Sequence, residues 1–300
     1  MTVMFARIAF RIARVVSFAM VLTGSAQAIT QSRSVDRHVI MAEPGKQIYL
    51  SDFYHNTIDV YPEAGYFQKP SDKITAKIDG PLGLCVDKNG DLYVANGNDG
   101  TVPIFHRGAV TPYRILTEGQ PRASGVAVDS KGNVYVVGSN DHTVYVYAPG
   151  ATQPSRTLTD SHQYVRSIAI DKSDDIFLGS QKQIDEIPAG STVPRIIDIV
   201  TYDSVGGFAI RSDGLLAVSV ENSIVAMYAP PYNRQTLKSS FFVDGFLGAI
   251  AFVPGQDRIW VANSTADVAQ SFTFSGELVG QTATGSIRYV YGLAVDPAAP

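Results

Sequence analysis

Residues 125–136, Gly-Val-Ala-Val-Asp-Ser-Lys-Gly-Asn-Val-Tyr-Val, recur in related form along most of the chain. The copy at 83–94 reads Gly-Leu-Cys-Val-Asp-Lys-Asn-Gly-Asp-Leu-Tyr-Val. Further copies begin at Ser167, Gly207, Ala249 and Gly292, so the six starts are 42, 42, 40, 42 and 43 residues apart. A period of this size, filled with short strands, indicates a radially repeated β architecture.

Each repeat reads as four short strands. An apolar strand at 126–128 ends in an Asp-x-x-Gly turn, in which Asp129 can bond the turn backbone and Gly132 can adopt a positive φ. A second strand at 134–136 leads through a polar turn to a third strand, and a short fourth strand follows an Ala-Pro-Gly turn. We therefore predict an all-β, six-bladed β-propeller of four-stranded antiparallel blades.

The second strand carries an aromatic residue at its centre in five of the six repeats. We expect these side chains to be buried between adjacent blades, where each contributes about 1.5–3 kcal/mol. The sites are Tyr49, Tyr93, Tyr135, Phe177 and Trp260, with Ala217 as the exception.

The last repeat contains only a first strand, at 291–296. Because a sheet ring must close to remove its open edges, we predict that this segment pairs with the strand at 48–50, which joins the two ends of the chain. The alternative is that residues 38–42, His-Val-Ile-Met-Ala, supply this inner strand.

The first 28 residues resemble an export signal. Arg7, Arg11 and Arg14 precede an apolar run at 15–22, and Ala26 and Ala28 supply the small residues that signal peptidase reads. The run is too short to span a bilayer. We predict a signal peptide at 1–28, a linker at 29–37 and the propeller at 38–300. The mature protein would be periplasmic or secreted, without a membrane anchor; the alternative is an uncleaved anchor.

Charge and cysteine content narrow the partners. Removal of residues 1–28 takes away three arginines and no acid, and it leaves 21 basic against 28 acidic residues. Nucleic-acid binding is not expected, since it depends on a basic face. Cys85 is the single cysteine, so no intramolecular disulfide can form, and its place in an apolar strand predicts a buried thiol. We expect a monomer.

The phrase at 125–136, followed by Asn-Asp-x-Thr-Val at 140–144 and Tyr-x-Pro-Gly at 147–150, resembles the NHL-repeat propellers. It also resembles the broader gluconolactonase-like six-bladed superfamily, in its exported bacterial form, over about residues 38–296. The resemblance implies the architecture. It leaves the activity open, because such propellers include lactonases, lyases, other hydrolases and binding scaffolds.

In a propeller blade the first strand runs from the top face to the bottom, so the crossovers before each first strand gather at the top. Arginine offers a planar, bidentate grip on carboxylate, and tyrosine offers a stacking face with a polar tip. We therefore predict a binding module for a small polar or anionic ligand, or for a partner protein, on the top face. The candidate ligand residues are Arg122, Tyr164, Arg166, Arg288, Tyr289 and Tyr291.

A divalent-metal-dependent lactonase or hydrolase is the main alternative. A divalent cation needs several oxygen ligands, which the resembling enzymes place near the starts of the inner strands. The residues directly before the six first strands include no carboxylate, so we predict no cofactor, no metal ligand and no catalytic residue. These residues are Leu82, Ser124, Arg166, Gly206, Gly248 and Tyr291.

Two histidines also fall near the top face. His55 and His142 share the turn between the second and third strands, and we interpret them as turn residues rather than general bases.

A second alternative function is a structural scaffold without a small ligand, in which Phe246 and Tyr291 would plug the channel.

Overall fold

The computed structural model describes residues 46–63, 65–117, 122–159, 164–181, 183–199, 204–220 and 222–296. The predicted signal peptide, the linker and the 38–42 strand lie outside these ranges. The described chain is all β apart from one short 3₁₀ helix, η1 (Arg234–Thr236). No helix within it is long and apolar enough to cross a membrane.

Four sheets each contain four strands, and all their neighbours are antiparallel. In hydrogen-bonded order the first is β24 (Val290–Asp296), β1 (Gln47–Asp52), β2 (Thr57–Pro62) and β4 (Asp72–Ile74); the second is β5 (Pro81–Val86), β6 (Leu92–Asn96), β7 (Val102–Phe105) and β8 (Arg114–Leu116); the third is β9 (Ala123–Val128), β10 (Val134–Gly138), β11 (Thr143–Tyr147) and β12 (Arg156–Thr159); the fourth is β13 (Ser167–Ile170), β14 (Ile176–Gly179), β15 (Ile184–Ile187) and β16 (Arg195–Ile196).

The fifth sheet has eight strands. The long strand β20 belongs to two sets of four, which together make seven strands, and β3 adds the eighth beside β23. The first part of β20 pairs with β19 and its last part pairs with β21. The order is β17 (Val205–Ile210), β18 (Leu216–Val220), β19 (Asn222–Tyr228), β20 (Leu237–Phe252), β21 (Arg258–Asn263), β22 (Val268–Thr273), β23 (Leu278–Thr282) and β3 (Tyr66–Gln68).

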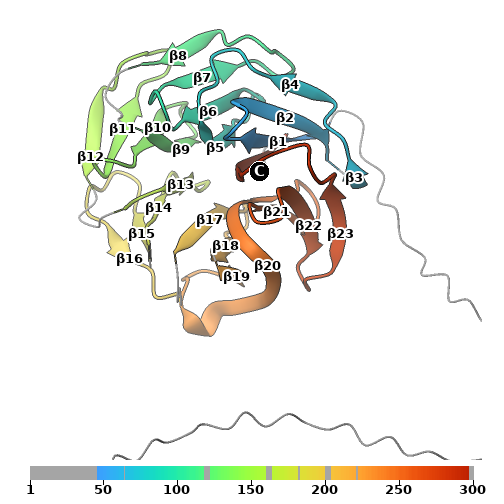
Figure 1. Cartoon of the computed structure of the whole chain (residues 1–300). Helices are drawn as coiled ribbons and strands as arrows, with labels where there is room; N and C mark the ends of the chain where they lie inside the picture. The colour runs from blue at the N-terminus through green and yellow to red at the C-terminus, as the bar shows by residue number, and fades with distance from the viewer. Residues whose placement is uncertain are drawn as a thin grey trace, which may run out of the picture. The chain divides into compact units, whose positions relative to one another are not determined.

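The strands are arranged around a central axis, as a β-propeller (Figure 1). The innermost strands follow one another around this axis in the order β5, β9, β13, β17, β20 and β24, and each contacts the next. The all-β expectation is confirmed. The sheets present their ends, where turns and crossovers lie, to the two faces of the molecule.

The Asp-x-x-Gly turns form as the sequence predicts. Asp129 Oδ1 accepts hydrogen bonds from the backbone N–H groups of Lys131 at 3.0 Å and Asn133 at 2.8 Å. Gly132 has a φ of 84°, which its missing side chain allows. Asp87 and Asp171 make the same pair of bonds in their own turns. These carboxylates are therefore structural parts of the turns.

The five predicted aromatic residues are buried, with no more than 5% of each exposed. Each stands opposite a small residue on the inner strand, so the ring covers a position where a larger side chain would not fit. The cross-strand pairs are Ala294 with Tyr49, Cys85 with Tyr93, Ala127 with Tyr135, Ala169 with Phe177 and Ala251 with Trp260.

The C-terminal strand β24 pairs antiparallel with β1, and it appears in red beside the blue N-terminal strand in Figure 1. Ile48 faces Val295, and Leu50 faces Leu293. The segment at 291–296 thus occupies the place that the sequence predicts for it. The alternative at 38–42 falls outside the described residues.

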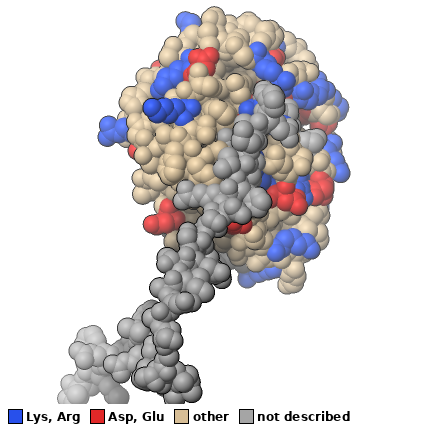
Figure 2. Space-filling view, turned by 90° about the vertical axis from the view of Figure 1, so that its right-hand side faces the viewer, with Lys and Arg blue, Asp and Glu red and all other residues tan. Residues whose placement is uncertain are grey.

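Charge is mixed on the side of the molecule shown in Figure 2. Lysine and arginine alternate there with aspartate and glutamate, and no large visible area carries a single sign.

Candidate functional site

The crossovers at the top face share an unusual backbone conformation. Arg122, Tyr164 and Tyr289 have φ values of 59°, 70° and 59°, in the left-handed region. Gly80 takes the equivalent place in another crossover, with a φ of 58°, and Gly245, within β20, also has a positive φ, of 127°. A side chain in this region costs about 1–2 kcal/mol, which glycine avoids. Three large side chains are therefore held where glycine would be less strained.

A repeated hydrogen bond fixes these crossovers. The N–H of Tyr289 donates to Asp267 Oδ1 at 2.6 Å, and the N–H of Tyr164 donates to His142 Nδ1 at 3.0 Å. The N–H groups of Gly80 and Gly245 donate in the same way to Asn56 Oδ1 and Ser223 Oγ. The bonds of Tyr289, Tyr164 and Gly80 each tie a crossover to the turn between the second and third strands of the preceding repeat, and the Gly245 bond joins β20 to β19.

These hydrogen bonds show that His55 and His142 do not occupy the same turn position, contrary to the sequence-based prediction. The residue equivalent to His142 is Asn56, because both have a positive φ and both accept from the next crossover. His55 lies one position earlier and instead meets Asp52, with 2.7 Å between Nδ1 and Oδ2. The interpretation of His142 as a turn residue agrees with its bond to Tyr164. The shared turn position was wrong by one residue.

An aromatic cluster surrounds the start of β24. The ring of Tyr289 lies 6.0 Å from those of Phe53 and Tyr54, in edge-to-face arrangement, and 6.5 Å from the nearly parallel ring of Tyr291. The guanidinium of Arg288 lies over the Tyr54 ring at 5.1 Å. Because Tyr54 is 60% exposed, this group presents a solvent-facing surface of rings and one arginine. We call it the Arg288 cluster.

The central channel has a narrow upper cavity of about 80 Å³ and a wide lower one of about 680 Å³. Arg166 and Tyr291 line the upper cavity. One apolar side chain from each inner strand lines both cavities and so marks the boundary between them. These six form the girdle, namely Leu84, Val126, Ile168, Phe208, Ile250 and Leu293.

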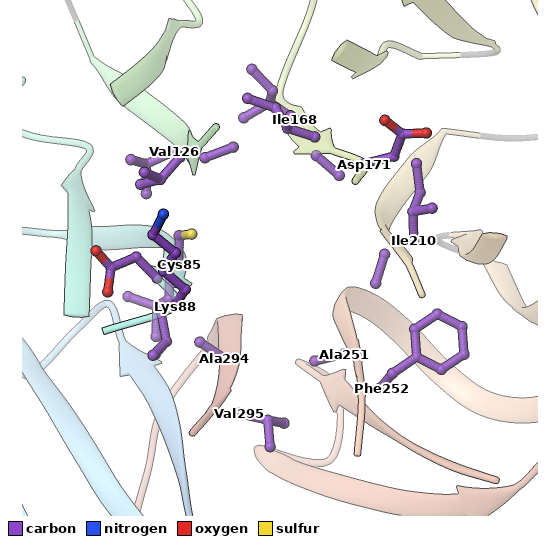
Figure 3. A pocket seen from close by; sticks show the side chains of 18 of the residues that line it. Cys85, Lys88, Val126, Ile168, Asp171, Ile210, Ala251, Phe252, Ala294 and Val295 are labelled. Atoms are coloured by element: carbon purple, nitrogen blue, oxygen red, sulfur yellow. The ribbon is translucent and has the colours of Figure 1, made fainter. Parts of the chain in front are cut away.

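The lower cavity opens toward the Asp-x-x-Gly turns and is walled by the last residues of all six inner strands (Figure 3). Its walls combine apolar or small side chains, among them Ile210, Ala251 and Val295, with charged and polar side chains at the turns. The Cys85 thiol also lines it, and burial raises the pKa of this thiol to about 12, so it stays protonated at neutral pH. The wider of the two channel cavities thus lies below the girdle, which sequence reasoning did not predict.

The structure brings four of the six predicted ligand residues near one another and leaves two apart. Arg288, Tyr289 and Tyr291 belong to the Arg288 cluster, and Tyr291 also meets the cavity that Arg166 lines. Tyr164 packs edge-on against His142 at 5.4 Å. Arg122 is exposed on its own crossover, where its carbonyl accepts from the N–H of Ser139.

Sequence reasoning missed Phe53 and Tyr54. Two adjacent aromatic residues in a turn that is otherwise polar were the available signal. Within the described part of the chain, no three His, Cys, Asp or Glu side chains gather in a metal-binding arrangement.

The comparisons with known proteins show the fold. No protein-family model matches the chain, and no curated protein matches it either. A chain from a nidogen–laminin complex is similar in structure, with a TM-score of 0.70 and 13% identity, over 84% of this chain and 98% of that one. A streptogramin B lyase is similar with a TM-score of 0.61 and 12% identity, over 84% of each chain. Both likenesses support a β-propeller.

Proposed function

We propose that this protein is an exported six-bladed β-propeller that binds a small polar or anionic ligand on its top face. The observation that carries the proposal is the strained crossover position, where Arg122, Tyr164 and Tyr289 stand in place of the glycine of another crossover, Gly80. Strain of this kind is retained where the side chain has a use.

The blade count follows from dividing the eight-stranded sheet within β20, which gives six sets of strands around the channel. The β24–β1 pair then closes the ring. Export is proposed from residues 1–28, whose cleavage would release a periplasmic or secreted monomer.

The chemistry of the top face favours an anion with an apolar or sugar-like body. Arg122, Arg166 and Arg288 can grip a carboxylate, and the rings of the Arg288 cluster can stack on a flat face. A partner protein with acidic and aromatic side chains would use the same groups. The nidogen–laminin complex, by its name, contains a protein assembly, which makes this second form of the proposal worth testing.

Replacing both Arg122 and Arg166 with alanine is expected to weaken binding of a carboxylated sugar by about a hundredfold. Each arginine contributes on the order of tenfold through charge-assisted hydrogen bonds. The probe is glucuronate, measured by titration calorimetry, with glucose as the uncharged control. Thermal melts of the double variant would separate a loss of binding from a loss of folding. Equal binding by wild type and double variant would contradict the proposal.

A metal-dependent lactonase remains the competing function, and a streptogramin B lyase shows by its name that a similar fold can belong to an enzyme. Calcium, magnesium, manganese and zinc would be titrated into metal-free protein beside a panel of lactones and esters. One bound ion per chain, with hydrolysis that a chelator removes, would replace the binding proposal. The binding proposal would be supported if the protein bound no metal ion, hydrolysed no lactone or ester, and still bound glucuronate.

Tyr164→Gly is expected to leave the protein as stable as the wild type or to stabilise it by up to about 1 kcal/mol, because glycine relieves the left-handed strain. The matched control is Tyr164→Ala, which removes the same ring but keeps the strain at φ 70°. The glycine variant should therefore unfold at higher urea than the alanine variant. If alanine proved the more stable of the two, the strain argument would be wrong.

A further inference from the structure

The lower cavity has the size and lining of a second ligand site, on the opposite face from the Arg288 cluster. We propose that it binds a small anionic amphiphile, with the apolar body inside the channel and the acid group at the mouth near Lys88 and Lys172. This site goes beyond the proposed top-face function and does not depend on it.

The cavity is large enough for such a ligand. Its volume of about 680 Å³ lies within the range of roughly 300–1,000 Å³ that small-molecule sites occupy. All six inner strands contribute to its wall, so the wall is rigid and formed before any ligand arrives (Figure 3). The girdle side chains form an apolar boundary between this cavity and the upper one.

The width of the cavity has a cause in the repeat. One inner-strand position is always small, with cysteine in one copy and alanine in the other five. An aromatic ring stands opposite it on the second strand in five copies, and Ala217 stands opposite it in the sixth. Small residues at the same height on all six strands leave an apolar space at the axis. An apolar space of this kind takes up apolar groups in preference to water.

The carboxylates at the mouth of the lower cavity already accept hydrogen bonds from the protein. Asp87 and Asp129 each accept two backbone N–H groups and also receive a tyrosine hydroxyl, from Tyr93 and Tyr135. The carboxylate of Asp171 points away from the opening in Figure 3. The hydrogen bonds hold the Asp87 and Asp129 carboxylates toward their own turns.

The basic groups at the mouth remain available. Lys88 Nζ donates only to a neutral carbonyl, that of Ser130, at 3.0 Å, and the Lys172 ammonium has no partner among the described residues. Both residues line the cavity. Arg211 lines it too, but Asp213 and Asp257 neutralise it. Two lysines at the mouth of an apolar cavity are complementary to a molecule with an apolar body and one acid group.

The test uses two fluorescent probes on the mature protein. The anionic dye 1-anilinonaphthalene-8-sulfonate should bind saturably at one site per chain. The variant Lys88→Gln/Lys172→Gln should weaken it about tenfold, the loss of one charge-assisted contact. The neutral dye N-phenyl-1-naphthylamine should change less than twofold. Lys131→Gln is the matched control, because this lysine lies in the same kind of turn but does not line the cavity.

A competition series tests the apolar part. Hexanoate, octanoate and decanoate should displace the anionic dye with affinities that rise about fourfold per added CH₂. Ile210→Trp, which fills the cavity from its wall, should remove binding of both dyes, and thermal melts would verify that it folds. Tyr289→Ala should leave dye binding unchanged, which separates this site from the top face.

Three outcomes would overturn the proposal. The first is equal dye affinity for Lys88→Gln/Lys172→Gln and wild type. The second is flat affinity along the acid series. The third is loss of dye binding in Phe242→Ser, because Phe242 is 69% exposed outside the channel and would then be the true dye site.

Discussion

Glu63→Ala is expected to lower the free energy of unfolding by about 3–5 kcal/mol, because it leaves a buried guanidinium without its partner. Glu63 and Arg258 are 1% and 3% exposed, and their side chains form an ion pair. Burial lowers the pKa of Arg258 despite the nearby carboxylate, which shows that desolvation of this arginine is substantial. Urea unfolding of the mature protein would measure the loss.

The pair lies where the chain crosses from the first sheet to the fifth. Glu63 directly follows β2, and Arg258 begins β21. Trp260 Nε1 donates to the carbonyl of Glu63 at 3.1 Å, and β3 pairs in parallel with β23 a few residues later. This segment therefore joins the two sheets independently of the β24–β1 pair, and its loss should loosen their contact.

Two variants separate the ion pair from general effects. Glu63→Leu/Arg258→Met replaces both charges with apolar groups and should recover most of the stability that the single variant loses. Asp257→Asn removes a carboxylate that is 80% exposed and should cost less than about 1 kcal/mol. A double variant as unstable as Glu63→Ala would show that the unpaired charge is not the cause.

The repeat in the sequence carried most of the information about the fold. Local signals were enough for the strands and turns, since Asp129 and Gly132 form their turn without help from distant residues. The pairing of β24 with β1 also followed, because only one incomplete repeat needed a partner. The contacts of the segment around Glu63 were not predictable from the sequence. They depend on Arg258 and Trp260, nearly two hundred residues away.

The candidate site was predictable in place but not in detail. Topology alone puts the crossovers together, so Arg288, Tyr289 and Tyr291 could be named. Their partners Phe53 and Tyr54 come from a turn at the other end of the chain and meet them only through the β24–β1 pair. The left-handed backbone of Arg122 has no sequence signal, because arginine and tyrosine are rare in that conformation.

The lower cavity required the whole ring. Alanine at one position of a strand predicts only local packing. The cavity exists because six such positions face one axis, a fact that no single repeat contains. The sequence shows the small residue that each repeat contributes to the cavity wall, but only the structure shows the cavity that the six residues enclose.

Gly292→Ala is expected to destabilise the protein by about 3 kcal/mol or more, because a methyl group there would meet backbone. A Cβ at Gly292 would lie 1.8 Å from the carbonyl oxygen of Leu82, on the neighbouring inner strand. The inner strands approach one another most closely at this level. A rigid carbonyl cannot turn aside as a flexible side chain can, so β24 or β5 would have to shift.

Four other inner-strand glycines provide a graded series for the same substitution. The distance from an added Cβ to the nearest backbone atom is 2.0 Å at Gly206, 2.6 Å at Gly83 and Gly248, and 3.1 Å at Gly125. The loss of stability should follow this order, with Gly292→Ala the largest and Gly125→Ala below about 1 kcal/mol. At Gly125 the smaller entropy of the unfolded alanine chain offsets part of the cost.

Urea unfolding of the five variants would test whether close approach of the inner strands controls stability. If losses follow the distances, glycine stands at these five positions because neighbouring backbones meet at the narrow end of the channel. If all five variants lose about the same amount, the cost would come from alanine in the strand rather than from the approach. A large loss at Gly125 with a small one at Gly292 would contradict the packing of β24 against β5 directly.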